Sequence, residues 1–293
     1  MYIFPLFRTV SKTSLYSLLF AFLLLADSCS RKPLVAPTND RTLPLQAYLG
    51  LPSRQSGNLP NDSSEYLLYK PAFVVSYQPA KGVARWVSWH LQSSDLGTAD
   101  RQDDFRPDED LPRNFPLIKP TDYTNSGFDR GHLCPSGDRT ATQTANSATF
   151  VMSNMIPQAP SLNRGIWNDV EEYCRTKVKL GYEAYLYAGG YGAGGKGSNG
   201  SATTIAKGKV SVPGRCWKVI LIMPEGDNDY ARLEKESIEV IAVDMPNSQD
   251  VAGTGWRRWQ LSVRQLEGLT GLDFFSALPR STQDRIENHT PTF

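Results

Sequence analysis

Strand-like runs dominate the middle of this chain. Runs rich in β-branched and aromatic residues, a composition that favours β-strands, occur at 72–77, 84–91, 149–152, 183–188, 209–213, 217–223 and 239–244. Helical periodicity is clear in only two places. One begins near Leu162, where Ile166, Val170 and Tyr173 form an apolar stripe, and the other spans 262–269. Many strands, few helices and no regular βαβ alternation predict an α+β fold with a mainly antiparallel central sheet.

Length and charge limit the kind of protein this can be. The 293 residues, 40% of them hydrophobic, allow a sizeable core in one large domain or two small ones. The net charge is +1, and a leader ending at Ser28 would leave equal numbers of basic and acidic residues. A neutral chain has no general attraction for nucleic acid, so phosphate binding must come from a local patch. This disfavours a protein that coats DNA, but not an enzyme that grips one phosphate.

Residues 1–28 have the features of an export signal. Arg8 and Lys12 precede an apolar stretch at 15–26, which is shorter than a typical transmembrane helix. Small residues then lead to Cys29, so both ordinary signal cleavage and processing as a lipoprotein with a lipid on Cys29 remain open, although Asp27 is unusual beside a lipid-accepting cysteine. We expect an exported protein that is secreted, periplasmic or lipid-anchored at the cell envelope.

Residues 29–62 are rich in Pro, Ser, Asn and Arg, which predicts a disordered tether before a domain at 63–293. Four cysteines, at 29, 134, 174 and 216, leave the disulfide pairing open. The sequence has no Cys-x-x-Cys pair, so a cysteine zinc site is disfavoured.

The run Asp129-Arg130-Gly131-His132 places an imidazole close to a guanidinium, in a chain with only three histidines. An imidazole can take a proton from water near neutral pH, and a guanidinium can hold phosphate oxygens with two parallel hydrogen bonds. Glycine lets the backbone approach a ligand or adopt a conformation that other residues avoid. Four residues alone fit a surface turn with a salt bridge equally well.

Two further motifs follow in order: Ser-Asn-Met-Ile-Pro-Gln at 153–158 and Leu-Asn-Arg-Gly-Ile-Trp at 162–167, with Glu171 and Glu172 beyond them. Together with residues 129–132, they resemble the DNA/RNA non-specific endonucleases, the Serratia-nuclease-like ββα-metal enzymes, over roughly 65–285. The resemblance implies a central sheet with helices on both faces. It also implies Mg²⁺-dependent hydrolysis of DNA and RNA, with Mn²⁺ as a substitute ion and little sequence preference.

The matched positions suggest roles. His132 would be the general base and Asn163 the metal ligand, since Mg²⁺ accepts an amide oxygen and keeps most of its waters. Asn163 could instead cap a helix, and could do both only if the helix starts irregularly. Glu171 lies two helical turns later, about 12 Å along the axis, so a role through a metal-bound water is easier than direct ligation. A solvated helix face is the alternative for Glu171.

Arg130 and Arg101 would hold the phosphate, with Arg106 as an alternative to Arg101 because that segment varies in spacing. The family position that Asn154 matches binds the scissile phosphate or positions the base, whereas an ordinary turn is the simpler explanation. Asp129 is expected to be structural, orienting Arg130 or a nearby backbone group.

Other classes fit less well. The glycine-rich stretch at 189–198 follows the phosphate-loop pattern until Gly197, where a Ser or Thr is needed, so a surface loop between strands is favoured. Neither Gly-x-Ser-x-Gly nor His-Glu-x-x-His occurs. The remaining alternative is an exported nucleic-acid-binding or surface protein that keeps the scaffold without activity. The sequence predicts DNA and RNA as substrates and indicates no protein partner; it leaves the preference between DNA and RNA open.

Overall fold

A computed structural model describes residues 1, 44–52, 64–234 and 237–288. Its centre is a seven-stranded sheet in which every neighbouring pair is antiparallel. In spatial order the strands are β1 (Tyr66–Tyr69), β2 (Val74–Gln78), β3 (Val83–Leu91), β6 (Tyr182–Tyr191), β11 (Arg215–Pro224), β12 (Glu239–Pro246) and β13 (Gln260–Leu261). The predicted α+β class with an antiparallel sheet is confirmed.

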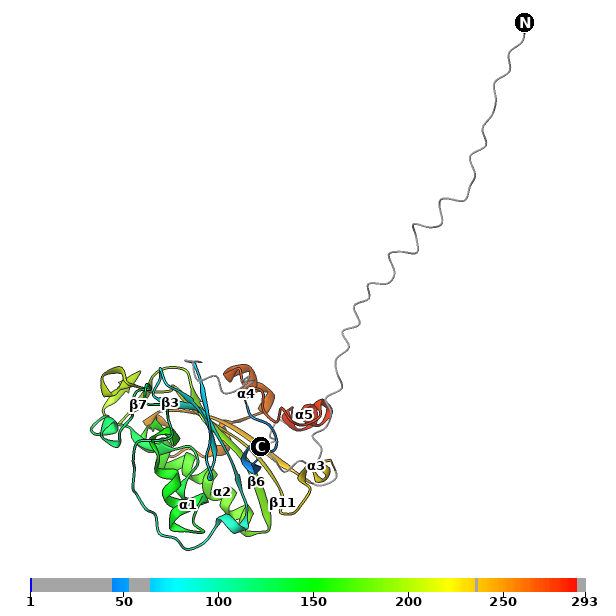
Figure 1. Ribbon diagram of the computed structural model, residues 1–293, viewed down its shortest axis with the longest axis horizontal. Coiled ribbons are helices and arrows are strands. Elements are labelled where there is room, and N and C mark those ends of the chain that lie inside the picture. Colours follow the sequence, from blue (N-terminus) through cyan, green and yellow to red (C-terminus); the bar gives the residue numbers. More distant parts are fainter. Residues whose placement is uncertain (2–43, 53–63, 235–236, 289–293) are drawn as a thin grey trace. The chain divides into compact units, whose positions relative to one another are not determined.

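Two hydrophobic cores cover the two faces of the sheet. Alternate residues of a strand point to opposite faces, so β11 sends Ile220 to one core and Val219 to the other. Helix α2 (Trp167–Lys179) packs on the first face, and α4 (Val263–Thr270) and α5 (Arg280–Glu287) pack on the second (Figure 1). Helices on both faces match the arrangement that the family resemblance implied.

A separate strand pair lies on the first face and leads to α2. β4 (Asp129–His132) pairs antiparallel with β5 (Met155–Gln158), with His132 opposite Met155. A π-helical turn, Leu162–Ile166, then runs into α2. Two short strands followed by a helix form the ββα unit, which brings all three sequence motifs together.

The remaining elements are short. The small helices are α1 (Gln143–Ser147) and α3 (Asp229–Arg232), and the small strands are β7 (Gly195–Gly197), β8 (Gly200–Ala202), β9 (Thr204–Ile205) and β10 (Val210–Ser211). 3₁₀ turns cover Leu45–Ala47, Ser93–Asp95, Pro120–Tyr123, Ser136–Asp138, Ala148–Phe150, Met152–Asn154, Ala206–Gly208, Gln249–Val251 and Trp256–Trp259. The glycine-rich stretch forms the β7–β8 hairpin and no strand-to-helix phosphate loop.

One predicted strand is wrong. Residues 149–152 form 3₁₀ turns in which only Val151 bridges another segment, at Arg106. The Thr149 hydroxyl donates to the Asn146 carbonyl, and the Thr149 carbonyl accepts from the Asn154 side chain. The second bond occupies the Thr149 carbonyl, which a strand ladder would need, because polar side chains compete with regular structure for the backbone.

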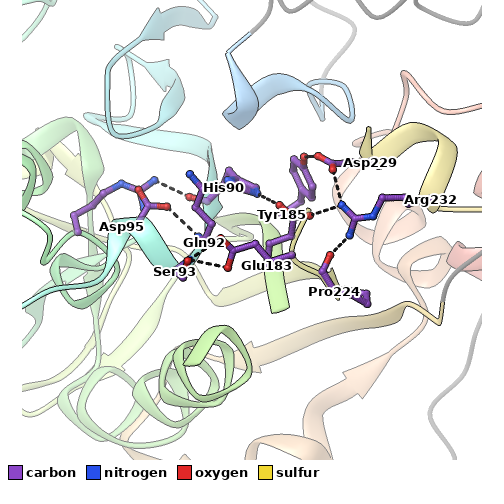
Figure 2. A network of polar contacts seen from close by, with 11 residues as sticks. His90, Gln92, Ser93, Asp95, Glu183, Tyr185, Pro224, Asp229 and Arg232 are labelled. Carbon is purple, nitrogen blue, oxygen red and sulfur yellow. Dashed lines mark hydrogen bonds and ion pairs between the residues drawn. The ribbon is translucent and has the colours of Figure 1, made fainter. Parts of the chain in front are cut away.

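A buried polar network lies on the second face, opposite α2. Figure 2 shows Glu183 between His90, whose Nε2 lies 3.0 Å from Glu183 Oε2, and Arg232, which also contacts Asp229. Tyr185 donates its hydroxyl proton to Asp229. This network ties α3 to the sheet.

The N-terminal predictions fall mostly outside the described residues. The export signal, Cys29 and most of the predicted tether lie in the ranges 2–43 and 53–63, which the structure does not describe. Within the tether range, residues 44–52 are folded: Ala47 and Leu49 are buried in the second core. Among the described residues Cys134, Cys174 and Cys216 are buried free thiols, and no helix is long and apolar enough to cross a membrane.

Candidate active site

A cavity of about 500 Å³ opens where β4, the π-helical turn and the start of α2 meet. It is lined by Arg101, Arg130, His132, Pro135, Ser136, Gly137, Thr140, Asn146, Asn163, Arg164, Asn168, Glu171, Glu172 and Arg175. Five of the six predicted site residues are among them, and Asn154 is the exception. Four arginines against two glutamates make the cavity attractive to a phosphate.

His132 is held between two aromatic rings. Its ring centroid lies 5.5 Å from that of Phe105 and 4.9 Å from that of Phe150. Its Nε2 is buried without a hydrogen-bond partner among the described residues. Burial, aided by the charges of Arg101 and Arg130, lowers the pKa of His132 to about 3. The imidazole is therefore neutral at physiological pH.

The same two rings support the two arginines. The Arg130 guanidinium lies 4.2 Å from the Phe105 ring centroid and makes no hydrogen bond or ion pair with a described residue. Arg101 lies 4.8 Å from the Phe150 centroid, donates from Nη1 to Ser136 Oγ and pairs through Nε with Asp103 over 2.7 Å. Stacking on a ring fixes a guanidinium while leaving N–H donors for a ligand.

Arg106, the alternative to Arg101, faces elsewhere. Its guanidinium donates to the Asp104 carboxylate and the Ser147 carbonyl, and it does not line the cavity. The structure therefore favours Arg101 as the second cationic group of the cavity.

Asn163 lies inside the π-helical turn, where Gly165 departs from helical geometry with φ −109° and ψ −117°. Its Nδ2 donates to Asp129 Oδ2 over 2.9 Å. Because an ionised carboxylate only accepts hydrogen bonds, this contact fixes which end of the amide is nitrogen. The amide oxygen is left for another partner. Asn163 does not cap a helix, because Ser161 and Ile166 hold the cap positions of the π-helical turn and of α2.

Asp129 is structural, as expected, but its partners differ from those predicted. Arg164 donates to both carboxylate oxygens, from Nε over 2.8 Å and from Nη2 over 2.7 Å. Asp129 thus orients Asn163 and Arg164 rather than Arg130.

Glu171 faces the cavity from α2 and is buried. Its Oε1 accepts a hydrogen bond from Lys218 over 3.1 Å. Burial raises the pKa of Glu171, and the Lys218 charge opposes that rise. The neighbouring Glu172 is largely exposed and pairs with Arg175, as the helical spacing predicts.

Asn154 lies behind the cavity, fully buried. Its Oδ1 accepts from the Cys134 backbone N–H, and its Nδ2 donates to the carbonyls of Cys134 and Thr149. With the amide committed to backbone groups, the predicted contact to the scissile phosphate is incompatible with this geometry. Its bonds to Cys134 hold the chain two residues after His132, which agrees with the other expected role, positioning the base.

Gly131 is needed for packing. A Cβ at this position would overlap the buried Gln158 side chain, and its φ is not positive. The expected close approach to a ligand is therefore not the reason for this glycine.

We predict that Gly131→Ala lowers the free energy of unfolding by about 1–3 kcal/mol, measured by urea denaturation. Gly131→Ala/Gln158→Ala should recover part of the loss, and an undiminished single variant would contradict the packing argument.

The low pKa of His132 predicts an acid-sensitive fold. The unfolded histidine binds a proton near pH 6.5, whereas the folded one stays neutral down to about pH 3. Its stabilising contribution is complete above pH 6.5 and is lost as the pH falls, by up to about 1.4 kcal/mol per pH unit. Urea midpoints between neutral pH and pH 4.5 should fall more steeply for the wild type than for His132→Gln. Parallel curves would contradict the burial of a neutral imidazole.

Sequence reasoning missed several residues of the site. Arg175 follows Glu171 by one helical turn, a spacing that could have identified it. Lys218 is the only charged residue in the apolar run 217–223, which was also a usable signal. No signal in the sequence identified Phe105 or Phe150, because their contacts with His132 depend on how distant segments pack.

This ββα unit, with its histidine, arginines and asparagine around one cavity, defines a nuclease of a known class. Residues 53–281 match the family model described as DNA/RNA non-specific endonuclease. The chain belongs to this family and is a nuclease.

Among its relatives, a nuclease of Nostoc sp. is 44% identical over 76% of this chain and 78% of its own length. Nuclease C1 of Cunninghamella echinulata is 36% identical, covering 73% of this chain and 84% of its own. The solved structure of an EndoG/EndoGI complex aligns with a TM-score of 0.65 and 28% identity, covering 81% of this chain and 92% of that one. The predicted family is confirmed.

Proposed function

We propose that this nuclease is a metal-dependent endonuclease that hydrolyses phosphodiester bonds of DNA and RNA with little sequence preference. One observation carries the proposal: a buried imidazole nitrogen with no partner among the described residues, an oriented amide oxygen and two ring-supported guanidiniums share one cavity.

The oxygen donors fit a hard divalent cation. Mg²⁺ takes few protein ligands, keeps several waters and prefers carbonyl and carboxylate oxygens. Asn163 would hold the ion directly, and Glu171 would hold one of its waters. When bound, the ion would supply positive charge to the phosphate and the leaving oxygen.

The chain's own residues divide the remaining work. His132, neutral and buried, removes a proton from the attacking water. Arg130 and Arg101 hold the non-bridging oxygens and neutralise the charge that develops on them. Low sequence preference follows because contacts to phosphates position a nucleic acid without reading its bases.

The test is cleavage of supercoiled plasmid and of RNA by the purified protein, with Mg²⁺ and with EDTA. Cutting of both substrates that EDTA abolishes is the expected result. Cutting of one substrate alone would narrow the substrate class. Binding of both without cutting, by folded protein with Mg²⁺ or Mn²⁺, would instead support the inactive scaffold.

A further inference from the structure

Lys218 is a charged residue at the centre of the sheet. It lies on β11 between β6 and β12 and is fully buried. By strand alternation it shares its face with Cys216 and Ile220, which belong to the core beneath α2. A buried ammonium is costly unless it is paired, and an apolar side chain of similar volume often stabilises such a position as well or better.

The ammonium contacts three side chains: Glu171, which lines the cavity, and two buried tryptophans. Its Nζ donates to Glu171 Oε1 over 3.1 Å and lies 3.9 Å from the Trp167 ring centroid and 5.3 Å from that of Trp89. Faces of indole rings attract a cation, so both rings favour this placement. Among the described residues, Glu171 accepts a hydrogen bond through Oε1 only, which leaves Oε2 for the cavity that Glu171 lines.

Both indoles are anchored on segments of the site. Trp167 Nε1 donates to the His132 carbonyl over 3.2 Å, and Trp89 Nε1 donates to Asp138 over 2.9 Å. Asp138 in turn accepts from Arg175 over 2.8 Å. Lys218 thus lies where the strand that carries His132 and the helix that carries Glu171 come together.

We propose that Lys218 is a positioning residue for the reaction: it fixes the Glu171 carboxylate in the cavity, where the carboxylate would hold a water of a cation bound by Asn163, while Trp167 links Lys218 to the backbone of His132. This inference rests on the proposed function, because it assigns Lys218 a part in that same metal site. The two indoles hold the ammonium, and its hydrogen bond to Oε1 sets the direction of the carboxylate, so loss of the ammonium frees Glu171 to rotate.

The experiment compares Lys218→Met, Glu171→Gln and the double variant in the full chain. Methionine keeps the length and apolar stem of lysine and removes its charge. Mn²⁺ affinity is measured by calorimetry without nucleic acid, and kcat and KM are measured over a range of Mg²⁺ concentrations. Lys218→Met should weaken Mn²⁺ binding and lower kcat by about 10- to 100-fold each, the usual cost of losing a partner of a metal-site group, with KM for DNA nearly unchanged.

Non-additivity separates positioning from packing. If Lys218 acts through Glu171, the double variant should equal Glu171→Gln in Mn²⁺ affinity and kcat. Losses that add, or wild-type Mn²⁺ affinity in Lys218→Met, would overturn the proposal. If Lys218→Met fails to fold, the double variant, which removes both charges of the pair, is compared with Glu171→Gln. Equal Mn²⁺ affinities would support the proposal, and a further loss in the double variant would overturn it.

Glu183→Gln is the matched control. It breaks the buried network of His90, Glu183 and Arg232 on the opposite face of the sheet (Figure 2). Glu183→Gln should lower the melting temperature without changing Mn²⁺ affinity. If it weakened Mn²⁺ binding as much as Lys218→Met does, the effect of Lys218 would be general destabilisation, and the proposal would be overturned. If the wild type binds Mn²⁺ but cuts neither nucleic acid, the proposed function is refuted. The Mn²⁺ affinities of the variants would still show whether Lys218 positions Glu171.

Discussion

Replacing His132 by alanine is expected to lower kcat by at least about 10²-fold at neutral pH, the usual contribution of a general base. The imidazole is neutral there, and its buried Nε2 has no other partner among the described residues. Alanine leaves no group at this point of the cavity to accept the proton of water. Arg130 and Asn163 remain in place, so KM for a labelled oligonucleotide and the Mg²⁺ requirement should change little.

Two further variants guard against a trivial loss of folding. His132→Gln keeps much of the side chain's volume between Phe105 and Phe150 and should lose activity to the same degree. His90→Gln removes the other described histidine, buried against Glu183 on the opposite face, and should retain kcat while melting earlier. Near-normal turnover by His132→Ala would refute the base assignment.

The five inner strands of the sheet could be predicted because their signal is local, whereas the edge strands β1 and β13 were missed. β3 and β11 are long runs of apolar, aromatic and β-branched residues, and both appear within two residues of their expected bounds. The segment at 149–152 has a similar composition, but the strand predicted there was wrong. There the Asn154 amide takes the Thr149 carbonyl, a choice that depends on the fold around it and not on the composition of the run.

Which residues gather at the cavity could be predicted from three motifs, whereas the contacts that support them could not. His132 and Asn163 were identified by residue type and order. The stacking of Arg130 on Phe105, and the bond between Lys218 and Glu171, join residues whose distance is set only when the sheet, the turns and α2 pack together. For Asn154 the motif suggested either a contact with the phosphate or positioning of the base, and only the contacts of its amide with backbone groups beside His132 distinguish the two.

Replacing Asn163 by alanine is the second large effect we expect. It removes the one amide oxygen that Asp129 orients, and with it the proposed direct link between protein and cation. We expect kcat to fall by about 10²-fold or more, as when a group that stabilises transition-state charge is lost. The Mg²⁺ concentration for half-maximal activity should rise as well. Asn168→Ala removes an amide from the same cavity without a predicted ligand role, and so controls for local disturbance.

Asp129→Ala separates ligation from orientation at the same position. Without the carboxylate, the Asn163 amide can turn and Arg164 loses its partner, yet the amide oxygen remains. An intermediate loss of metal affinity, about 10- to 100-fold, is therefore expected. Mn²⁺ calorimetry on the three variants would rank Asn163→Ala as the weakest binder, then Asp129→Ala, with Asn168→Ala near the wild type. If Asn163→Ala bound Mn²⁺ as tightly as Asn168→Ala, the cation would have to be held elsewhere in the cavity, and the orienting contact with Asp129 would serve folding alone.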